Sequence, residues 1–432
     1  MKKSLQRKLQ LRNRTLPIFI VVLLILAVIF PHKSWWIVFL SFGLALAFSY
    51  LSIYQLTDRL KIGREMRFGW AQVGDILEER INVQNTSSMP AIWLQIQDHT
   101  NLTDKSKSIG TSVGAHGHTS WRTQHKCIRR GLYRLGPTTI HTGDLFGLFE
   151  LTLHDPAESN ILITPPTVPL PQITVASGGL TGDGRLTKGV FEQSVAVSTV
   201  RDYQPLDPLN HIHWPLSAKR GELTSRIFEN TPTGNWWIIQ DMNQAVQVGE
   251  DQNNSLEIGI ILAASLVNKG IRSGKAVGLI ANDAQNTWIP PRYSGDQTMK
   301  LLRNLALSEP GDLSLKNLLK RSLSSFQQAA SLVVITPDVS MSWWEPLIWL
   351  KSKGMTPTII ILDPNSFGAQ ANTRAAIVKL QNAGISCYQI DSDMFAEQIT
   401  PDNNPLWEWR VFGPGYAIPV KKPQNPAWKQ IQ

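Results

Sequence analysis

Two histidines, His211 and His213, lie two residues apart in the stretch RDYQPLDPLNHIHWPLSAKRGEL, residues 201–223. On a β-strand the side chains of residues i and i+2 point the same way, so this pair could bind one metal ion. A zinc site needs at least three protein ligands, and the stretch offers no clear third one. The sequence also lacks an H-x-x-x-H helix and a G-x-x-x-x-G-K-[ST] phosphate loop. Metal chemistry at this pair is therefore the less favoured interpretation.

The favoured interpretation makes the same stretch a structural joint. Its ionic side chains would form a cluster that ties a loop to the edge of a sheet; they are Arg201, Asp207, Lys219 and Arg220. Trp214 would anchor the loop in the core, because a buried indole brings a large apolar surface.

Carboxylates that follow apolar runs form a second group of candidate residues. The runs NWWIIQD, KAVGLIAND, SLVVITPD, TPTIIILD and ISCYQI are typical of buried parallel strands, and helical patterns lie between most of them. The first helical pattern, SLEIGIILAASLVNKG, starts with a capping box at Asn254 and Glu257. These βα units predict an α/β domain with a doubly wound parallel sheet over residues 234–400. Ligands of such sheets bind beyond the carboxyl ends of the strands, where the sequence places Asp241, Asp283, Asp338 and Asp363.

Residues 60–165 are predicted to form β structure. Apolar and polar residues alternate in DILEERINVQNTSSMPAIWLQIQD, with NTSSMP as the turn between two strands. Further short strands follow, and no helical period longer than one turn appears. A small antiparallel β-sandwich of the immunoglobulin-like type is the expected fold.

The N-terminus combines basic and apolar segments. Residues 1–15 carry six cationic side chains and no acidic one, and form a predicted basic cytoplasmic tail. Residues 16–30 and 35–54 are uncharged, and their lengths predict two transmembrane helices over residues 16–54. A cleaved signal peptide is the alternative, but no small-x-small site follows Phe30 and a second apolar segment comes at once. Cationic residues at both ends of the helical hairpin predict that both chain termini are cytoplasmic.

The remaining segments give weaker signals. Residues 166–233 are predicted to be a linker that contains the opening stretch, and residues 401–432 a tail without a period. Cys127 and Cys387 match no metal or disulfide spacing, as suits a reducing compartment. The formal net charge is +9, of which the tail holds six, so only three positive charges remain for the rest of the chain. Nucleic acid is therefore not an expected partner.

Two motifs, together with this order of segments, resemble the bacterial membrane-anchored proteins of the domain-of-unknown-function family fifty-eight. The last domain of that family is similar to a von Willebrand factor A domain. The motif RRGLYRLGPTTIHTGDLFGLFE carries the resemblance at Arg130, Gly131, Tyr133, Leu135, Gly136, Pro137, Asp144, Phe146, Gly147, Leu148 and Phe149. The opening stretch carries it at Arg201, Tyr203, Asp207, Ile212, Trp214, Ala218 and Lys219. This chain departs from the family pattern at Leu206 and His213, where relatives usually have glycine and an acidic residue.

The A-domain resemblance implies a metal-ion-dependent adhesion site, in which D-x-S-x-S ends the first strand. This chain has Asp241-Met242-Asn243-Gln244-Ala245 there. Asp241, Asn243 and Asp338 could offer oxygen ligands to Mg²⁺, but Ala245 offers none. A degenerate site that holds no cofactor is expected, with Mg²⁺ binding as the alternative.

Three functions follow as hypotheses. The first is a multi-pass protein of the bacterial cell membrane that faces the cytoplasm, binds another protein and is not an enzyme. For its partner the resemblance implies a MoxR-type AAA+ ATPase, and for its role the maturation or assembly of envelope or metal-containing proteins. The second is a metal-dependent hydrolase or transferase that uses Asp241 and Asp338. The third is a structural membrane scaffold. Trp343, Trp344 and Trp349 are expected to pack in the core, with a partner surface as the alternative.

Overall fold

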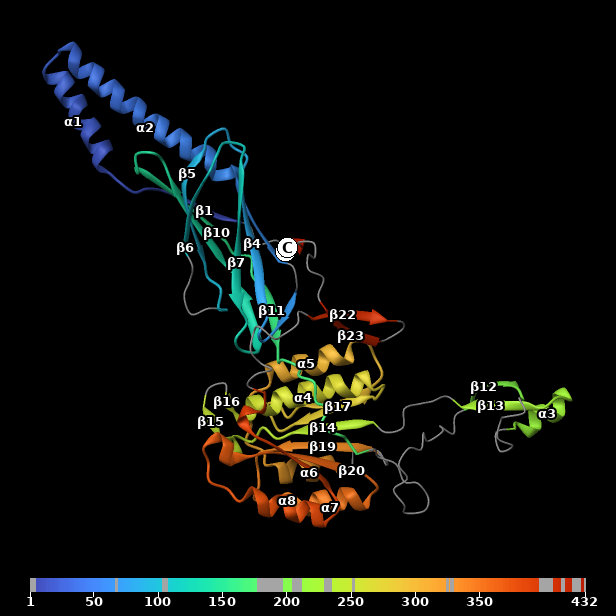
Figure 1. Cartoon of the computed structure of the whole chain (residues 1–432). Helices are drawn as coiled ribbons and strands as arrows, with labels where there is room; N and C mark the ends of the chain where they lie inside the picture. The colour runs from blue at the N-terminus through green and yellow to red at the C-terminus, as the bar shows by residue number, and fades with distance from the viewer. Residues whose placement is uncertain are drawn as a thin grey trace. The chain divides into compact units, whose positions relative to one another are not determined.

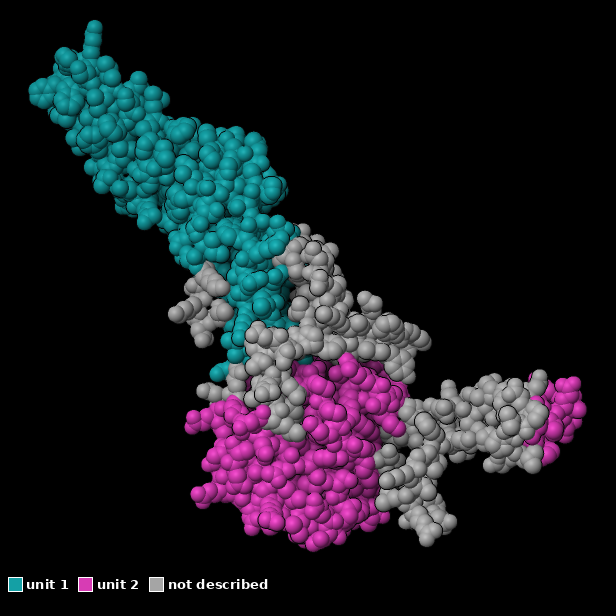
Figure 2. Space-filling view, viewed as in Figure 1, with its two compact units in different colours: residues 1–164, 423–432 teal, residues 165–422 magenta. Residues whose placement is uncertain are grey.

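The computed structural model describes residues 5–66, 69–102, 108–176, 197–203, 212–228, 235–250, 253–323, 326, 330–395, 407–412, 416–421 and 429–430. The chain forms two compact units (Figure 2). Residues 1–164 with 423–432 make the first, called the β unit here, and residues 165–422 make the second, called the α/β unit. The protein is therefore multidomain, as the sequence predicts.

Three sheets make up most of the β unit. Their orders are β1-β10-β9-β5-β6, β24-β2-β4-β7 and β3-β11-β8, and only the β3–β11 pair is parallel. Residues from the two larger sheets share one apolar core, which includes Val83, Leu94, Ile140 and Leu151. The strands are β1 (Gln6–Leu11), β2 (Leu60–Met66), β3 (Trp70–Gln72), β4 (Ile76–Asn85), β5 (Ala91–Asp98), β6 (Ser108–Val113), β7 (His118–Lys126), β8 (Gly131–Leu135), β9 (Thr138–Gly143), β10 (Phe149–Asp155), β11 (Ser159–Thr164) and β24 (Lys429–Gln430).

Two apolar helices, α1 (Thr15–Ile29) and α2 (Lys33–Arg59), form a hairpin in this unit (Figure 1). Among the described helices, α2 is the one that is long and apolar enough to cross a membrane, and α1 is a shorter apolar helix. The last turns of α2 bury Ile53 and Leu56 in the core of the β unit, and β2 begins directly at Leu60. This long apolar helix near the N-terminus suggests that the protein associates with a membrane.

The N-terminal segment, for which the sequence predicts a basic cytoplasmic tail over residues 1–15, contains the strand β1 in its described part. β1 pairs with β10 in antiparallel register from Gln6↔His154 to Leu11↔Phe149. Leu5 and Leu9 pack against the core, and the backbone of β1 satisfies the otherwise unpaired edge of β10. Its basic, weakly alternating sequence gave no sign of this pairing.

One six-stranded sheet forms the centre of the α/β unit, in the order β18-β17-β14-β19-β20-β21. Helices cover both faces: residues of α4 and α5 share a core with one face, and residues of α6, α7 and α8 with the other (Figure 1). The strands are β14 (Trp236–Gln240), β17 (Val277–Ala281), β18 (Trp288–Arg292), β19 (Ser331–Thr336), β20 (Thr356–Leu362) and β21 (Ser386–Ile390). The helices are α4 (Ser255–Arg272), α5 (Gln297–Leu307), α6 (Leu315–Ser322), α7 (Trp344–Ser352) and α8 (Thr373–Asn382).

The predicted parallel sheet is mixed, because β18 joins its edge in antiparallel orientation. β18 carries Pro290 and Pro291, and a strand with prolines is confined to an edge. Shorter elements complete the unit: η2 (Gln244–Val246), β15 (Gly249–Glu250), β16 (Asn253–Asn254), η3 (Pro364–Phe367) and η4 (Ser392–Phe395).

The predicted linker over residues 166–233 contains ordered structure at both ends. Residues 165–176 form a strap that packs in the core of the α/β unit, with Val168 and Ile173 buried. The ammonium group of Lys269 on α4 donates to the carbonyl oxygens of Leu170 and Ile173, which fixes the strap to the helix. The Gly-rich residues 177–196 of the predicted linker lie outside the described part of the chain.

Two further segments contain strands that the sequence did not indicate. β12 (Val197–Asp202) and β13 (Thr224–Phe228) form an antiparallel pair that encloses α3 (Trp214–Arg220). In the predicted C-terminal tail, β22 (Trp407–Phe412) pairs with β23 (Tyr416–Lys421), and β24 pairs with β2. Residues 401–432 show no period in the sequence, and the described ones form these three strands.

Candidate functional site

Asp241 lies directly after β14, at the carboxyl end of a central strand of the α/β sheet. β14 is flanked by β17 and β19, and all three strands run parallel. Numbered by their order in the chain, the six strands lie 3-2-1-4-5-6 across the sheet. Doubly wound sheets with this order bind ligands beyond the carboxyl ends of their central strands. The sequence therefore placed Asp241 at the correct edge of the sheet.

The carboxylate of Asp241 accepts three hydrogen bonds from the protein. Its Oδ1 accepts from Nδ2 of Asn282 at 2.8 Å and from the backbone N–H of Asn243 at 3.2 Å. Its Oδ2 accepts from the Thr336 hydroxyl at 2.7 Å. Asn282 follows β17 and Thr336 ends β19, so the carboxylate connects the ends of three neighbouring strands.

Asn282 extends this network into the next loop. Its Oδ1 accepts from the backbone N–H of Met242 at 2.6 Å, and its Nδ2 also donates to the carbonyl oxygen of Leu313 at 2.5 Å. Gly311 lies against the same turn, where an added Cβ would come within 2.3 Å of the carbonyl oxygen of Asn282. The site is therefore a close-packed polar cluster with no space for a further group between these atoms.

Burial controls the ionisation of the Asp241 carboxyl group, which is 1% exposed as a residue. Loss of hydration raises the pKa above its ordinary value of 3.8, and the hydrogen bonds from Thr336, Asn282 and Asn243 act in the opposite direction. The negative charge of Asp338 adds a small upward contribution. Proton affinity at this position is thus higher than in an exposed aspartate.

The other two predicted metal ligands bind within their own turns. Oδ1 of Asn243 accepts from the backbone N–H of Ala245 at 3.2 Å, as in an Asx turn. Oδ1 of Asp338 accepts from the backbone N–H of Ser340 at 2.8 Å. Two further predicted strand-end carboxylates behave likewise: Asp283 accepts from Thr287, and Asp363 accepts from Asn365 and Thr373.

This donor set does not fit Mg²⁺. A magnesium site needs oxygen ligands that converge on one point with free lone pairs, whereas the oxygens of Asp241 face N–H and O–H donors. Within the described residues, no group of three or more His, Cys, Asp or Glu side chains is placed to hold a metal ion. The arrangement instead stabilises the ends of three strands.

Sequence reasoning identified Asp241 but missed Asn282 and Thr336, which complete its surroundings. Asn282 adjoins Asp283, and Thr336 lies two residues before Asp338, but neither residue is a carboxylate. Polar residues that end otherwise apolar strands were the signal, because a buried polar side chain must find a hydrogen-bond partner.

The described residues of the opening stretch include the short helix α3. Trp214 is 61% exposed, so the prediction that it anchors the core is wrong. Ile212 is the buried residue and bridges to Ser225. His213 does not lie on a strand: it caps α3, and its Nδ1 accepts from the backbone N–H of Leu216.

Several residues of this signature have limited roles in the described structure. Tyr203 is half-buried, and its backbone N–H donates to the carbonyl oxygen of Leu223. Ala218, Lys219 and Arg220 are exposed on α3, and Arg201 lies on β12. Asp207 and His211 lie outside the described residues, so the predicted ion-pair cluster and histidine pair stay predictions.

The second signature forms β8, β9 and the turns around them. Gly136 has a φ of +88°, and an added Cβ would come within 2.6 Å of the carbonyl oxygen of Ala157, which explains the glycine. Arg130, Gly131, Tyr133 and Leu135 lie at β8, Pro137 follows it, and Asp144, Phe146, Gly147, Leu148 and Phe149 form the turn into β10. No chemistry of a reactive site is evident in this group.

A second buried polar cluster lies between the sheets of the β unit. The Arg64 guanidinium forms ion pairs with Glu79 at 3.2 Å and with Asp98, and Nε2 of His125 lies 2.9 Å from Glu79. Burial raises the pKa of Asp98, and the positive charge of Arg64 acts against that rise. Glu79 and His125 are each 1% exposed, and Nδ1 of His125 has no hydrogen-bond partner among the described residues. The cavity beside them has a volume of about 10 Å³, which is room for one water molecule.

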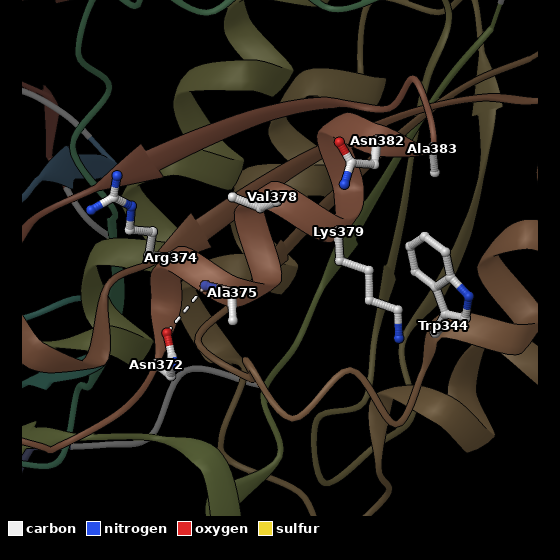
Figure 3. A pocket seen from close by; sticks show the side chains of 8 residues that line it. All are labelled: Trp344, Asn372, Arg374, Ala375, Val378, Lys379, Asn382 and Ala383. Atoms are coloured by element: carbon white, nitrogen blue, oxygen red, sulfur yellow. Dashed lines mark hydrogen bonds between the residues drawn. The ribbon is translucent and has the colours of Figure 1, made fainter.

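An open groove lies along α8, on the helical layer that also contains α7 (Figure 3). Its volume is about 730 Å³. Lys379 points toward Trp344, with Nζ 4.7 Å from the ring centroid, as in a cation–π pair. The remaining lining residues are Asn372, Arg374, Ala375, Val378, Asn382 and Ala383.

The three tryptophans near this groove differ in environment. Trp343 is fully buried and donates from Nε1 to the carbonyl oxygen of Asp338, which confirms core packing for this residue. Trp344 is half-buried in the groove, and Trp349 is 42% exposed, with Nζ of Lys353 5.1 Å from its ring. Core packing therefore accounts for one of the three.

Comparison with known proteins gives a partial match. A family model described as "Protein of unknown function DUF58" matches residues 199–368. "Uncharacterized protein YeaD" of Bacillus subtilis (strain 168) is 23% identical over 309 residues, which cover 67% of this chain and 74% of that protein. The match agrees with the family resemblance over residues 199–368, and neither description states an activity.

Solved structures add little. Proximal thread matrix protein 1 from the mussel byssus has a TM-score of 0.27 at 10% identity, covering 39% of this chain and 46% of that one. The CARDB domain of the PF1109 protein from Pyrococcus furiosus has a TM-score of 0.18 at 12% identity, covering 24% and 91%. Similarity at these TM-scores carries no argument about fold or function.

Proposed function

We propose that this chain is a membrane-anchored binding protein whose α/β unit docks an acidic segment of a partner protein. The observation that carries the proposal is the groove of α7 and α8, where an aromatic ring and exposed cationic side chains lie together. Three features support the proposal. The anchor supports attachment to the membrane, the groove supports partner binding, and the polar cluster at Asp241 favours binding over metal catalysis.

The anchor is proposed to be a two-helix hairpin that enters the bilayer from one side. α1 has 15 residues and rises by about 23 Å, and α2 rises by about 24 Å between Lys33 and Ser49, where it meets the β unit. Both arms thus nearly match the ~30 Å of hydrocarbon in a bilayer. β1 precedes α1 and β2 follows α2, and both strands belong to the β unit, so the two ends of the hairpin must lie on the same side of the membrane.

The orientation follows from charge. Arg12 and Arg14 precede α1, and Arg59 and Lys61 flank the end of α2, whereas the turn between the helices holds only Lys33. Cationic residues stay on the cytoplasmic side, so the β unit and the α/β unit are proposed to face the cytoplasm of a bacterial cell.

The groove favours an acidic partner. The segment made of α7, the residue after it and α8 has a net charge of +3. It contains one acidic residue, Glu345, and four cationic ones, Lys351, Lys353, Arg374 and Lys379. In the described part of the chain, Arg374 and Lys379 are exposed and have no acidic partner within ion-pair distance. Aromatic residues and arginine at a recess are typical of residues that dominate binding energy.

The closed cluster at Asp241 argues for binding and against metal catalysis. Both carboxylate oxygens already accept hydrogen bonds from buried donors, which does not favour the hydrolase or transferase alternative. We propose a von Willebrand factor A-like fold for the α/β unit, because helices on both faces of its sheet fit the doubly wound fold that the resemblance implies. The resemblance also supplies the partner class, a MoxR-type AAA+ ATPase.

Site-specific crosslinking in membranes tests the proposal. A photoreactive residue at Val378, which is 46% exposed in the groove, is expected to crosslink a partner protein in cells, and the yield should fall strongly in the Arg374→Glu/Lys379→Glu variant. Lys300→Glu/Arg303→Glu on α5 makes the same change of charge on the helical layer of the opposite face and should leave the yield unchanged.

The identity of the captured protein tests the partner class. Recovery of an ATPase of the MoxR type would support the class that the resemblance supplies. An absent crosslink at Val378, or equal loss in both charge variants, would show that the groove is not the docking surface.

A further inference from the structure

The turn between β9 and β10 exposes two large apolar side chains side by side. Leu145 is 64% exposed and Phe146 is 54% exposed, while Asp144 and Leu148 on either side are 4% exposed. Turns usually carry small or polar residues, so an exposed leucine–phenylalanine pair needs a partner of its own.

The turn is held in one conformation. The carboxylate of Asp144 accepts from the backbone N–H of Phe146 at 2.9 Å and from that of Phe149 at 2.7 Å. Gly147 has a φ of +67°, a conformation that favours glycine, and its N–H donates to the carbonyl oxygen of Asp144. These bonds fix the backbone that presents Leu145 and Phe146 to the outside.

Hydrogen bonds attach the same turn to both arms of the helical hairpin. The hydroxyl of Ser49 on α2 donates to Oδ2 of Asp144. Before α1, the backbone N–H groups of Arg12 and Asn13 donate to the carbonyl oxygen of Leu148 at 2.8 and 3.2 Å. The turn therefore lies at the foot of the hairpin, beside the points where both helices leave the β unit (Figure 1).

The β9–β10 turn and the polar β4–β5 turn of the same unit bond to α2 at different points along the helix. The β4–β5 turn bonds to α2 further from the apolar end, from the Ser88 hydroxyl to Gln55 at 2.7 Å and from the backbone N–H of Thr86 to the carbonyl oxygen of Arg59 at 2.9 Å. Gln55 and Arg59 follow Ser49 by six and ten residues, which is about 9 and 15 Å along the helix axis. The apolar turn thus lies closer to the apolar end of α2 than the β4–β5 turn does.

We infer that Leu145 and Phe146 insert into the interfacial layer of the bilayer that holds the hairpin. This inference rests on the proposed membrane insertion of α1 and α2. The partner is the phospholipid bilayer itself, because the turn is continuous with the apolar surface of the hairpin and flanked by the cationic Arg12 and Arg14. The two helices and this turn would then contact the bilayer at three points. Because the turn lies to one side of the hairpin, its contact prevents the β unit from rotating about the hairpin axis.

Depth-dependent quenching of single labels tests the inference. In the full-length Cys387→Ser protein, with the buried Cys127 retained, one cysteine is placed at Phe146, Val28 or Ser88 and labelled with the fluorophore NBD. The proteins are reconstituted in vesicles of phosphatidylcholine and phosphatidylglycerol, with and without lipids that carry a nitroxide near the headgroup. Side chains at all three positions are exposed, so the substitutions leave the core intact.

The expected result is quenching at position 146 by at least about twofold, since an interfacial side chain lies within the first ~5–10 Å of the headgroup and acyl boundary. Val28 in α1 reports whether the hairpin is inserted, and Ser88 in the polar β4–β5 turn should not be quenched. Quenching at Val28 with equal, weak signals at 146 and 88 would overturn the inference and leave the hairpin proposal intact. No quenching at any position would overturn both, and equal strong quenching at 146 and 88 would refute the assigned levels of the two turns.

Discussion

Substitution of Asp241 separates a structural carboxylate from a metal ligand. Asp241→Ala removes the acceptor of three buried donors, on Asn282, Asn243 and Thr336. Each buried group left without a partner costs about 1–3 kcal/mol. Because the Thr336 hydroxyl can rotate and Asn282 keeps its bond to Leu313, we expect a total loss of about 2–4 kcal/mol in the stability of the sheet.

Asp241→Asn should behave differently, because the amide keeps the shape of the side chain. Its oxygen can accept the bonds from Asn282 and Asn243, and its NH₂ group can donate to the oxygen of Thr336. The substitution also removes the cost of burying a negative charge. We therefore expect the stability of this variant to lie within about 1 kcal/mol of the wild type.

The two variants should also differ from the wild type in their pH dependence. The pKa of Asp241 is raised above 3.8, so above that pH the folded state binds the proton more tightly than the unfolded state does. Wild-type stability should therefore fall as the pH rises from about 4 through the raised pKa of the folded protein, a change that the Asn variant lacks. The stability difference should shift in favour of Asp241→Asn over this window.

Hydrogen exchange in the full-length protein in detergent measures these differences. Protection of the backbone amides in β14 and β19, corrected for the intrinsic exchange rate at each pH, gives the free energy of opening of this part of the sheet. An Asn variant that loses as much protection as the Ala variant would refute the reasoning, because the charge itself would then be required. So would a gain in protection on addition of Mg²⁺ that appears only in the wild type.

Three further outcomes follow from other parts of the structure. Glu79→Ala removes one of the two carboxylate partners of the buried Arg64 and the partner of His125, and should destabilise the β unit by about 1–3 kcal/mol, seen as lost exchange protection in β4, whereas Glu79→Gln should cost less. Burial raises the pKa of the Cys387 thiol to about 11, so its alkylation by iodoacetamide should be slow at pH 8 and accelerate roughly tenfold per pH unit up to that value; a fast reaction at pH 8 would contradict the burial. Gly311→Ala should lower the free energy of unfolding of the α/β unit by more than about 2 kcal/mol, because the added Cβ has no space there. The matched Gly110→Ala, where the added Cβ meets open space, should change the free energy of unfolding little.

The sequence predicted those elements that have a clear pattern of apolar residues. β14, β19 and β20 are buried on both faces, and uninterrupted runs such as WWIIQ and SLVVIT are typical of such strands. The start of α4 was also correct, since the side chain of Asn254 accepts from the backbone N–H of Glu257 at 2.7 Å. β18 was missed because two prolines hide an edge strand, and β1 because its charged residues face solvent.

The candidate site could be predicted only in part, because its members come from separate strands. Asp241 was found from its place after an apolar run, but the bonds from Asn282 and Thr336 depend on which strands are neighbours in the sheet. Trp214 was misplaced for a related reason: a tryptophan among ionic residues suggests a core anchor, whereas burial in that segment falls on Ile212. The type of a residue indicates whether it can be buried, but the arrangement of the strands and helices determines whether it is buried.

The pairing of β1 with β10 constrains the order in which the protein can assemble. Gln6 pairs with His154, so 148 residues separate two neighbours in the same sheet. During synthesis the apolar helices are made and can enter the membrane long before β10 exists, and a contact between such distant segments forms slowly because of the entropy of closing the chain. The segment before α1 must therefore wait unpaired beside the nascent hairpin, and the edge that it will occupy stays open until the end of the β unit has been translated.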